Sequence, residues 1–328
     1  MTSPPAKARL GEKFFVVSPL VFFPQTSGKF EVYLKSGEEY VLYTRAQEEF
    51  TIAHRERLHG HGVEEVYILV GQREAYEEYV EANLGPILLN EELPSEVRAR
   101  VFYDVSVNVA KEVFESRLPE PMTERHYERL LKLVKRAARF FSHRDSLKSV
   151  GKLICHDYKT YSHSVHVMIY ALAILETFRL DPEELTAIGL GALLHDVGKT
   201  KVPRHVLNKK GKLSAEEWPL VKLHPVYGVA MCANMPLSQQ AVNCIMFHHE
   251  REDGSGYPAG LKGTDLPLAA KVAGVCDVYD ALTTNRPYAT GVSPFQALKI
   301  MKDEMSSALD QEAYRRLIMI LSGAAIID

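Results

Sequence analysis

One stretch of the chain carries most of the information on its fold and chemistry: His248-His249-Glu250-Arg251-Glu252-Asp253-Gly254-Ser255-Gly256-Tyr257-Pro258. An apolar, helix-like run leads into the two histidines, and a glycine-rich loop with a tyrosine and a proline follows at once. Imidazoles are common metal ligands, and glycines let a ligand approach the backbone closely. The stretch therefore predicts a helix that ends at a metal centre, followed by a loop that faces a substrate.

The composition is that of a globular protein with two domains. A chain of 328 residues has room for roughly two domains of ordinary size. Hydrophobic residues make up 46% and charged residues 25%, which is typical of a soluble protein. The net charge is −3, so the chain lacks the excess of basic residues typical of proteins that bind a nucleic acid polymer, and we expect no such polymer as a partner. Basic residues gather at 132–139, but in a helical pattern that indicates a solvated helix face.

The chain shows no sign of secretion or of a membrane span. Its four cysteines are far apart and form no CxxC pair, which predicts buried thiols in a reducing cytoplasm. The apolar run at 14–23 contains Pro19 and leads into strand-like sequence, so we do not interpret it as a signal peptide. Every apolar run is shorter than the ~18 residues that a membrane span needs. We therefore expect a soluble, cytoplasmic protein.

Residues 1–92 are expected to form a small α+β module. Strand patterns occupy 14–17, 30–34, 40–43 and 65–70, and helical patterns occupy 46–59 and 73–84. The module contains no nucleophile constellation, phosphate-binding loop or metal cluster, and its neighbouring histidines at 54, 59 and 61 are interpreted as surface groups. We predict a regulatory module that binds a partner protein, a small ligand or a second copy of the chain as a homodimer.

The rest of the chain is predicted to be all-α. Residues 93–144 form a helical connector with helices at 95–116 and 122–142, and residues 145–328 form a helical bundle. Capping signals for its helices stand at Asp181, Ser214, Ser238 and Asp265. Pro219 conflicts with the helix that follows Ser214, so a kink or a restart is expected there.

Within this bundle, potential metal ligands occur at predicted helix ends or on inward faces. Neighbouring residues on a helix point about 100° apart, so an adjacent pair shares a site most easily where the helix ends. Asp196 is suited to bridging two cations, because a carboxylate has two oxygens. Any one of these histidines alone is more often a core or surface residue, and the metal interpretation depends on the whole set. The set is His163, His195, Asp196, His224, His248, His249 and Asp277.

Seven ligands exceed the needs of one tetrahedral ion and suit two six-coordinate ions with waters. Imidazoles and carboxylates without a thiolate favour iron, with manganese and zinc as the alternatives. The other histidines of this region, at 143, 156, 166 and 205, are interpreted as structural or surface residues.

The motifs together resemble a known family. His195-Asp196 with Gly198-Lys199 resembles the HD superfamily of metal-dependent phosphohydrolases. With the stretch from His248 to Pro258, the chain is similar to the HD-GYP family of bacterial cyclic di-GMP phosphodiesterases over about 145–298. Further matching segments are Lys212-Leu213-Ser214, His224-Pro225, Asp277-Val278-Tyr279-Asp280-Ala281-Leu282 and Arg286-Pro287-Tyr288. The N-terminal module resembles, much more weakly, regulatory domains that precede some members.

The resemblance implies a reaction and a set of site residues. The reaction is hydrolysis of cyclic di-GMP to linear pGpG, and onward to GMP, by a hydroxide that bridges two divalent metal ions. The seven candidates become the metal ligands, and Lys199 joins Asp196 as a catalytic residue by contacting the scissile phosphate. Substrate contacts fall on Gly256, Tyr257, Pro258 and Arg286.

The chain departs from the family pattern at two places. Lys159 stands where some members carry a glutamate associated with a third metal, so a dinuclear site is predicted. Ala289 and Thr290 stand where family members often carry basic residues, which predicts weaker binding of the second phosphate of the substrate. Two alternatives stay open: a catalytically weak module that senses cyclic di-GMP or contacts a diguanylate cyclase, and an HD phosphohydrolase acting on another nucleotide, such as a hybrid cyclic dinucleotide or a dNTP.

Overall fold

The structure is a computed structural model that describes residues 13–37, 39–115, 122–142, 162–207, 209, 211–284 and 291–322. The chain divides into two compact units, Met1–Val105 and Ser106–Asp328. The first contains a small antiparallel sheet with helices, and the described part of the second is helical. The predicted fold class, an α+β module followed by an all-α domain, is confirmed. The three-part division at residues 92 and 144 stays a prediction.

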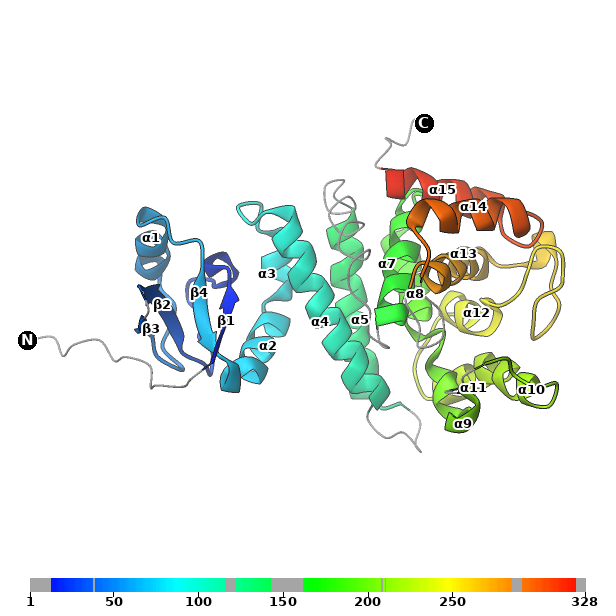
Figure 1. The fold of residues 1–328 in the computed structure, drawn as a ribbon, viewed down its shortest axis with the longest axis horizontal. Coiled ribbons are helices and arrows are strands. Elements are labelled where there is room, and N and C mark those ends of the chain that lie inside the picture. The colour runs from blue at the N-terminus through cyan, green and yellow to red at the C-terminus, as the bar shows by residue number, and fades with distance from the viewer. Residues whose placement is uncertain are drawn as a thin grey trace, which may run out of the picture. The chain divides into compact units, whose positions relative to one another are not determined.

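The N-terminal unit is built on a four-stranded antiparallel sheet with strand order β1-β4-β2-β3. A hairpin at one edge of the sheet pairs β2 with β3 and turns at Gly37, whose φ of 62° favours glycine. The strands are β1 Phe14–Val17, β2 Val32–Ser36, β3 Glu39–Thr44 and β4 Val66–Leu69. The helices are α1 Ile52–Gly60, α2 Arg73–Ala82 and α3 Leu84–Leu89, with short turns η1 Pro19–Val21 and η2 Val70–Gln72 (Figure 1).

One helix of this unit begins later than the sequence predicted. The pattern at 46–59 predicted a helix throughout, but α1 starts at Ile52, because Gln47 has a φ of 65° and cannot continue a helix. Thr51 caps the helix by accepting the backbone N–H of His54, and the His54 ring accepts the Thr51 N–H in return. The His54 side chain is 13% exposed, so it is a mostly buried capping residue and not the surface group that the sequence predicted.

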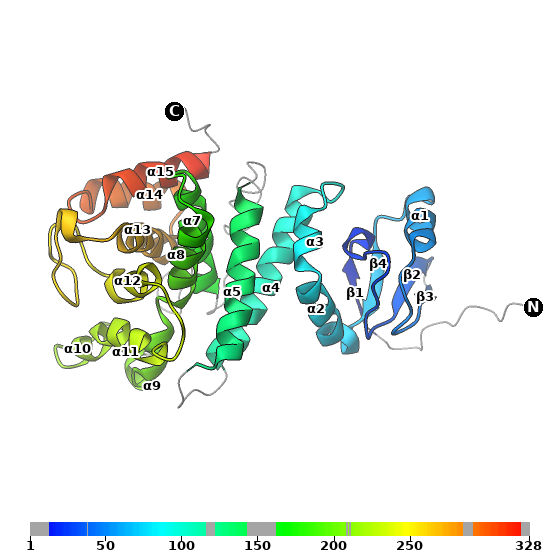
Figure 2. The same cartoon turned by 180° about the vertical axis from the view of Figure 1, so that it is seen from behind.

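The C-terminal unit is a bundle in which α8 packs against α7 and α12, and α7 packs against α13. In Figures 1 and 2, α14 and α15 run along one edge of this bundle and α9, α10 and α11 along the opposite edge. The helices are α5 Glu124–Phe141, α7 Ser162–Glu176, α8 Pro182–Leu194, α9 Arg204–Leu207, α10 Glu217–Lys222, α11 His224–Met231, α12 Gln239–Phe247, α13 Leu268–Thr283, α14 Pro294–Glu304 and α15 Gln311–Ser322. Helix α4 Ser95–Glu115 crosses the boundary between the two units, and the turns η3 Val197–Lys201 and η4 Gly263–Asp265 complete the set.

Glycines allow the central helices to pack closely. A Cβ on Gly189 would lie 2.6 Å from Cδ2 of Leu172 in α7, and one on Gly191 would lie 2.7 Å from the Ala241 carbonyl oxygen in α12. Only a residue without a side chain fits such gaps, so α8 can approach both neighbours. Helix α8 is buried along most of its length and ends at His195. The close packing therefore fixes the place where the first ligand candidates leave the helix.

The capping signals were correct for α8 and α12. Asp181 accepts the backbone N–H groups of Glu183 and Glu184 at the start of α8, and Ser238 caps α12. The exceptions are α10, where Glu216 and not Ser214 occupies the N-cap position, and α13, where Pro267 occupies the N-cap position and Asp265 lies in η4. Because proline fixes its own φ and needs no hydrogen bond, it can start this helix without a polar cap.

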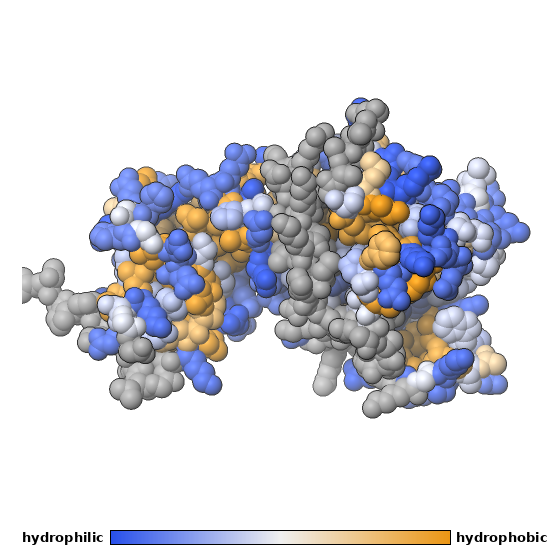
Figure 3. Space-filling model, turned by 45° about the horizontal axis from the view of Figure 1, so that its top comes forward, coloured by the Kyte–Doolittle hydropathy of each residue, from blue (hydrophilic) through white to orange (hydrophobic). Residues whose placement is uncertain are grey.

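The described surface is mixed in character. Figure 3 shows one face, on which hydrophobic residues reach the surface in patches among hydrophilic ones. Among the larger exposed hydrophobic side chains are Trp218, Leu223 and Val226, which lie in and beside α10 and α11. No helix in the described ranges combines the length and the apolar content that crossing a membrane requires.

Candidate metal centre

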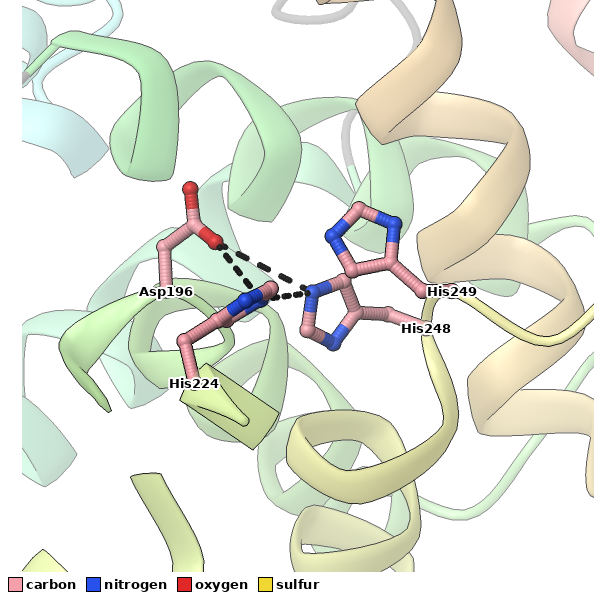
Figure 4. Close-up of side chains that lie close together, drawn as sticks. All are labelled: Asp196, His224, His248 and His249. Carbon is pink, nitrogen blue, oxygen red and sulfur yellow. Dashed lines mark hydrogen bonds and ion pairs between the residues drawn. The ribbon is translucent and has the colours of Figure 1, made fainter. Parts of the chain in front are cut away.

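The structure brings all seven predicted ligands into one cluster. Helix α7 carries His163 in its first turn, and α13 carries Asp277. His195-Asp196 directly follow α8, His224 is the first residue of α11, and His248-His249 directly follow α12. Figure 4 shows four of these side chains, with Asp196 and His224 pointing toward the imidazole of His248.

Asp196 lies at the centre of the cluster and uses both of its carboxylate oxygens. Its Oδ1 is 3.3 Å from Nε2 of His224 and 3.9 Å from Nε2 of His248. Its Oδ2 is 3.4 Å from Nε2 of His195 and 3.5 Å from Nε2 of His163. One carboxylate therefore faces two pairs of imidazoles, one pair on each oxygen.

The ligand atoms fall into two groups that share Asp196. Within each group the atoms lie within 4.8 Å of one another. The groups are Asp196, His224, His248 and His249, and His163, His195 and Asp196. Asp277 touches a member of each, with Oδ1 3.1 Å from Nε2 of His163 and Oδ2 3.7 Å from Nδ1 of His249. This arrangement suits two cations that share a carboxylate.

Three of the histidines are oriented by the backbone carbonyl three residues earlier. At the end of a helix such a carbonyl has no partner within the helix and can accept the Nδ1–H of an imidazole. The other ring nitrogen, Nε2, then keeps a lone pair and turns into the cluster. The Nδ1-to-oxygen distances are 2.7 Å for His195 to Ala192, 2.8 Å for His224 to Val221 and 2.9 Å for His248 to Ile245.

His163 is oriented by a carboxylate instead. Its Nδ1 lies 2.7 Å from Oδ2 of Asp280, whose Oδ1 is 2.7 Å from Nδ1 of His166. Asp280 is fully buried, one helical turn after Asp277 on α13. From the sequence, Asp280 was recognised only as part of a motif and without a role of its own. The equal spacing of His163–His166 and Asp277–Asp280 was the signal that could have paired them.

The carboxylates of the cluster are ionised. Burial alone would raise the pKa of Asp196, but the ammonium of Lys199 and the imidazole of His195 beside it outweigh burial and hold that pKa well below its usual range. Burial of Asp277 is likewise outweighed, first by the hydrogen-bonding imidazole of His163, so its pKa also lies well below the usual range. Both residues therefore present charged oxygens, as metal ligands must.

Most of the imidazoles are neutral. Burial lowers the pKa of His224, lowers that of His248 well below its usual value, and brings that of His249 to about 3. His163 differs: burial lowers its pKa, but carboxylates beside it, first that of Asp277, outweigh burial and raise the pKa to about 9. Neutral imidazoles with free Nε2 lone pairs are in the state that binds a cation.

Unpaired polar atoms show that these residues fit a metal. Nε2 of His195 and Oδ1 of Asp196 are buried and have no hydrogen-bond partner, and the buried Nε2 of His163 has only the Asp277 carboxylate, 3.1 Å away. A buried polar atom without a partner costs free energy, and all three atoms face the shared centre of the cluster. A cation there would satisfy them together, and the nitrogen and oxygen donors suit a first-row divalent metal.

Lys199 lies directly beside the cluster. Its Nζ is 2.5 Å from Oδ2 of Asp196, and about a third of its side chain is exposed. The turn that carries Lys199 requires a glycine at position 198, because a Cβ on Gly198 would lie 1.9 Å from the His224 carbonyl oxygen. The turn η3 can therefore press against α11 and hold the ammonium at the edge of the ligand set.

The predicted substrate loop lies against the same ligands. The Tyr257 ring stacks on the imidazole of His249, with 4.7 Å between centroids and 24° between planes. Gly256 passes so close to the Glu250 backbone that a Cβ would lie 2.4 Å from the Glu250 Cα, and Pro258 is exposed. Arg286 lies outside the described residues, and so do Lys159, Ala289 and Thr290.

Glu250 holds this loop in place, a role that the sequence analysis did not assign. It is 4% exposed, and its carboxylate accepts the backbone N–H groups of Ala259 at 2.6 Å, Gly260 at 3.1 Å and Leu261 at 3.1 Å. Hydrogen bonds to an ionised acceptor are stronger than neutral ones. A glutamate directly after the ligand pair was the available signal, but its partners lie nine to eleven residues away and cannot be read from a local pattern.

Comparisons with known proteins agree with this geometry. The sequence model of a family described as "HD domain" matches residues 117–313, which is more than half of the chain. This range contains all seven candidate ligands, Lys199 and the loop with Tyr257.

Curated relatives with similar sequences are named as phosphodiesterases. A cyclic di-GMP phosphodiesterase of Pseudomonas aeruginosa is 38% identical over 183 residues, which are 56% of this chain and 44% of that protein. One of Thermotoga maritima is 34% identical, covering 49% of this chain and 46% of the relative. A 3'3'-cGAMP-specific phosphodiesterase of Vibrio cholerae is 32% identical, covering 48% and 34%. The chain spans less than half the length of each of these relatives.

A solved structure has the same fold. It is Bd1817, an HDG"Y"P protein from Bdellovibrio bacteriovorus, with a TM-score of 0.65 over 94% of this chain and all of that one. At 24% sequence identity this likeness concerns the fold. The resemblance to the HD-GYP family that the motifs indicated is confirmed by these comparisons together.

A change at Asp280 tests how the ligands are oriented. Replacing Asp280 by Asn keeps the shape but removes the charge that fixes His163 and His166. We expect metal affinity to fall by about 10- to 100-fold, as is usual when a partner that orients a ligand is lost. Competition with a fluorescent chelator measures this directly. An affinity equal to that of the unmodified protein would show that Asp280 does not orient His163 for binding.

A change at Glu250 tests the anchoring of the loop. In Glu250→Ala the three N–H groups lose their acceptor, so amide hydrogen exchange at 259–261 should accelerate at least tenfold, equivalent to about 1.4 kcal/mol. Metal content should stay unchanged. Asp253→Ala is the matched control, because Asp253 is exposed and its side-chain partners among the described residues are Ser255 and Ser307. Equal exchange at 259–261 in the Glu250 variant and the unmodified chain would refute the anchoring role.

Proposed function

The chain belongs to the HD domain family, and on that premise we propose that it is a metal-dependent phosphodiesterase that hydrolyses cyclic di-GMP to pGpG and onward to GMP. One observation carries the proposal: two groups of ligand atoms share the Asp196 carboxylate, with the Lys199 ammonium beside it. The relatives named as cyclic di-GMP phosphodiesterases support the choice of substrate.

We propose two divalent cations as cofactors, iron first, with manganese and zinc as the alternatives. His163 and His195 would hold one ion, and His224, His248 and His249 the other, with Asp196 between them and Asp277 at their side. Imidazole and carboxylate donors support this choice of metals. Two ions are favoured over one because the two ligand groups lie on opposite oxygens of Asp196.

The cation pair would lower the pKa of a bound water and neutralise the phosphodiester. The residues of the chain supply the rest. Asp196 stays ionised at any pH near neutrality, because its pKa lies well below the usual range. The Lys199 side chain lies beside Asp196, where negative charge would grow on the phosphate during attack, and a cationic group held in place there stabilises the transition state. The ring of Tyr257, stacked on His249, offers a face for a purine base.

A second candidate substrate is a hybrid cyclic dinucleotide. The relative named as a 3'3'-cGAMP-specific phosphodiesterase favours it, at 32% identity. Stacking on Tyr257 does not separate guanine from adenine, because every base presents a π-face. A panel of cyclic dinucleotides assayed side by side therefore decides between the two substrates.

The remaining proposals concern compartment and regulation. We keep the cytoplasm as the proposed compartment, which the free, buried thiols of Cys232, Cys244 and Cys276 support. For the N-terminal unit we keep the proposal of a regulatory module that binds a partner protein, a ligand or a second copy of the chain.

The reaction is tested with purified protein loaded separately with iron, manganese or zinc. Incubation with cyclic di-GMP should give pGpG and then GMP on ion-exchange chromatography, in at least one of the three loadings. Conversion of 3'3'-cGAMP alone would select the second candidate. Absence of any product in all three loadings, with metal bound, would contradict the catalytic proposal.

A change at Lys199 tests its catalytic role. Lys199→Met should lower kcat about 100-fold, because it removes one positive charge from the reacting phosphate, and bound metal should remain. Lys302→Met is the matched control, since Lys302 is an exposed lysine on α14, and its kcat should be unchanged. A kcat for Lys199→Met within twofold of the control would remove Lys199 from the mechanism.

A further inference from the structure

A lysine lies close to two aromatic rings beside the ligand cluster. Nζ of Lys222 is 5.3 Å from the centre of the Tyr257 ring and 5.9 Å from the centre of the Trp218 ring. Both distances are within the range in which a cation is attracted to a π-face. Neither Lys222 nor Trp218 is among the site residues predicted from the sequence.

Local contacts fix the helix that carries this lysine. Ser214 and Glu217 exchange hydrogen bonds, with the Ser214 N–H donating at 2.7 Å and its hydroxyl accepting at 3.3 Å. Glu217 also binds Lys209 at 2.5 Å. Helix α10 begins at Glu217 and runs through Pro219, which lies in its first turn, so the restart expected at Pro219 is not found. The four-residue spacing of Trp218 and Lys222 puts them on one face of the helix.

The charge of Lys222 and the ring of Trp218 are both available to a ligand. Among the described residues no carboxylate comes within ion-pair distance of Lys222, whereas Lys209 is engaged by Glu217. Trp218 is 46% exposed although it is a large aromatic residue. A charged group and a π-face next to each other are the two features that nucleotide recognition uses most, for phosphate and for base.

The pair is linked to the ligand cluster on two sides. Lys222 precedes His224 by two residues, and Tyr257, which contacts Lys222, stacks on His249. His224 and His249 belong to the same ligand group. A substrate phosphate bound at that group would therefore have Lys222 and Trp218 as near neighbours.

We propose that Lys222 and Trp218 form a subsite for the half of the cyclic dinucleotide that is not being cleaved. Lys222 pairs with the second phosphate, and Trp218 stacks on the purine base beside it. This inference rests on the proposed function, because a cyclic dinucleotide carries two phosphodiesters and only one can occupy the ligand cluster. The second anion needs its own cation, and Lys222 supplies it.

Trp218 is itself the probe for a test, since it is the only tryptophan in the chain. The metal-loaded full chain is titrated with the bisphosphorothioate analogue of cyclic di-GMP, which resists hydrolysis, and tryptophan fluorescence is recorded. We expect a saturable change in fluorescence. Lys222→Met should raise the Kd about tenfold, the effect of losing one charge-assisted contact to phosphate.

Two further variants complete the test. Lys299→Met removes an exposed lysine on α14 and should leave the Kd unchanged. Trp218→Ala, measured by isothermal titration calorimetry, should weaken binding about tenfold through loss of stacking. Metal content of the Lys222 and Trp218 variants should match that of the unmodified protein; a loss of metal in Lys222→Met would assign the residue to support of His224 and overturn the subsite.

The outcomes separate this inference from the proposed function. Hydrolysis of cyclic di-GMP without a fluorescence change, or with equal Kd values for Lys222→Met and Lys299→Met, would overturn the subsite and leave the function standing. A saturable change that weakens in Lys222→Met, without turnover in any metal loading, would support the subsite and remove the catalytic proposal.

Discussion

The contact on which the rest of the site depends is the one between the buried carboxylate of Asp196 and the imidazoles on its two oxygens. A carboxylate removed from water is stable only when nearby positive charge or hydrogen-bond donors compensate it. Here Lys199 supplies one such charge at 2.5 Å. The remaining unpaired atoms around Asp196 make the cluster incomplete on its own and suited to cations.

Helix ends explain how a helical bundle can build such a centre. The last carbonyls of α8 and α12 have no partner within their helices, and the histidines that follow use them to fix Nδ1. This turns Nε2 inward without any further side chain. Helix α8 is followed by η3, which places Lys199 beside Asp196. Helix α12 is followed by the loop that Glu250 anchors, which places Tyr257 beside His249.

Much of this could be predicted from local sequence, because ligand residues, helix caps and glycine positions are local signals. Asp181 and Ser238 mark their helices by side-chain type alone, and the pairs at 195–196 and 248–249 mark helix ends. Contacts between distant residues could not be predicted in this way. Asp280 meets His163 across 117 residues, Glu250 reaches forward to Leu261, and Lys222 meets Tyr257 only after folding. The late start of α1 depends on the positive φ angle of Gln47, and glutamine as a residue type does not predict such an angle.

We propose above all that Asp196 is the ligand common to two metal ions. Elemental analysis of protein purified without oxygen, with the metal content expressed per chain, tests it most directly when the unmodified chain is compared with Asp196→Ala. If Asp196 binds both ions, the unmodified protein contains close to two metal ions per chain and the variant loses both. One ion per chain in the unmodified protein, or full metal content in Asp196→Ala, would contradict it.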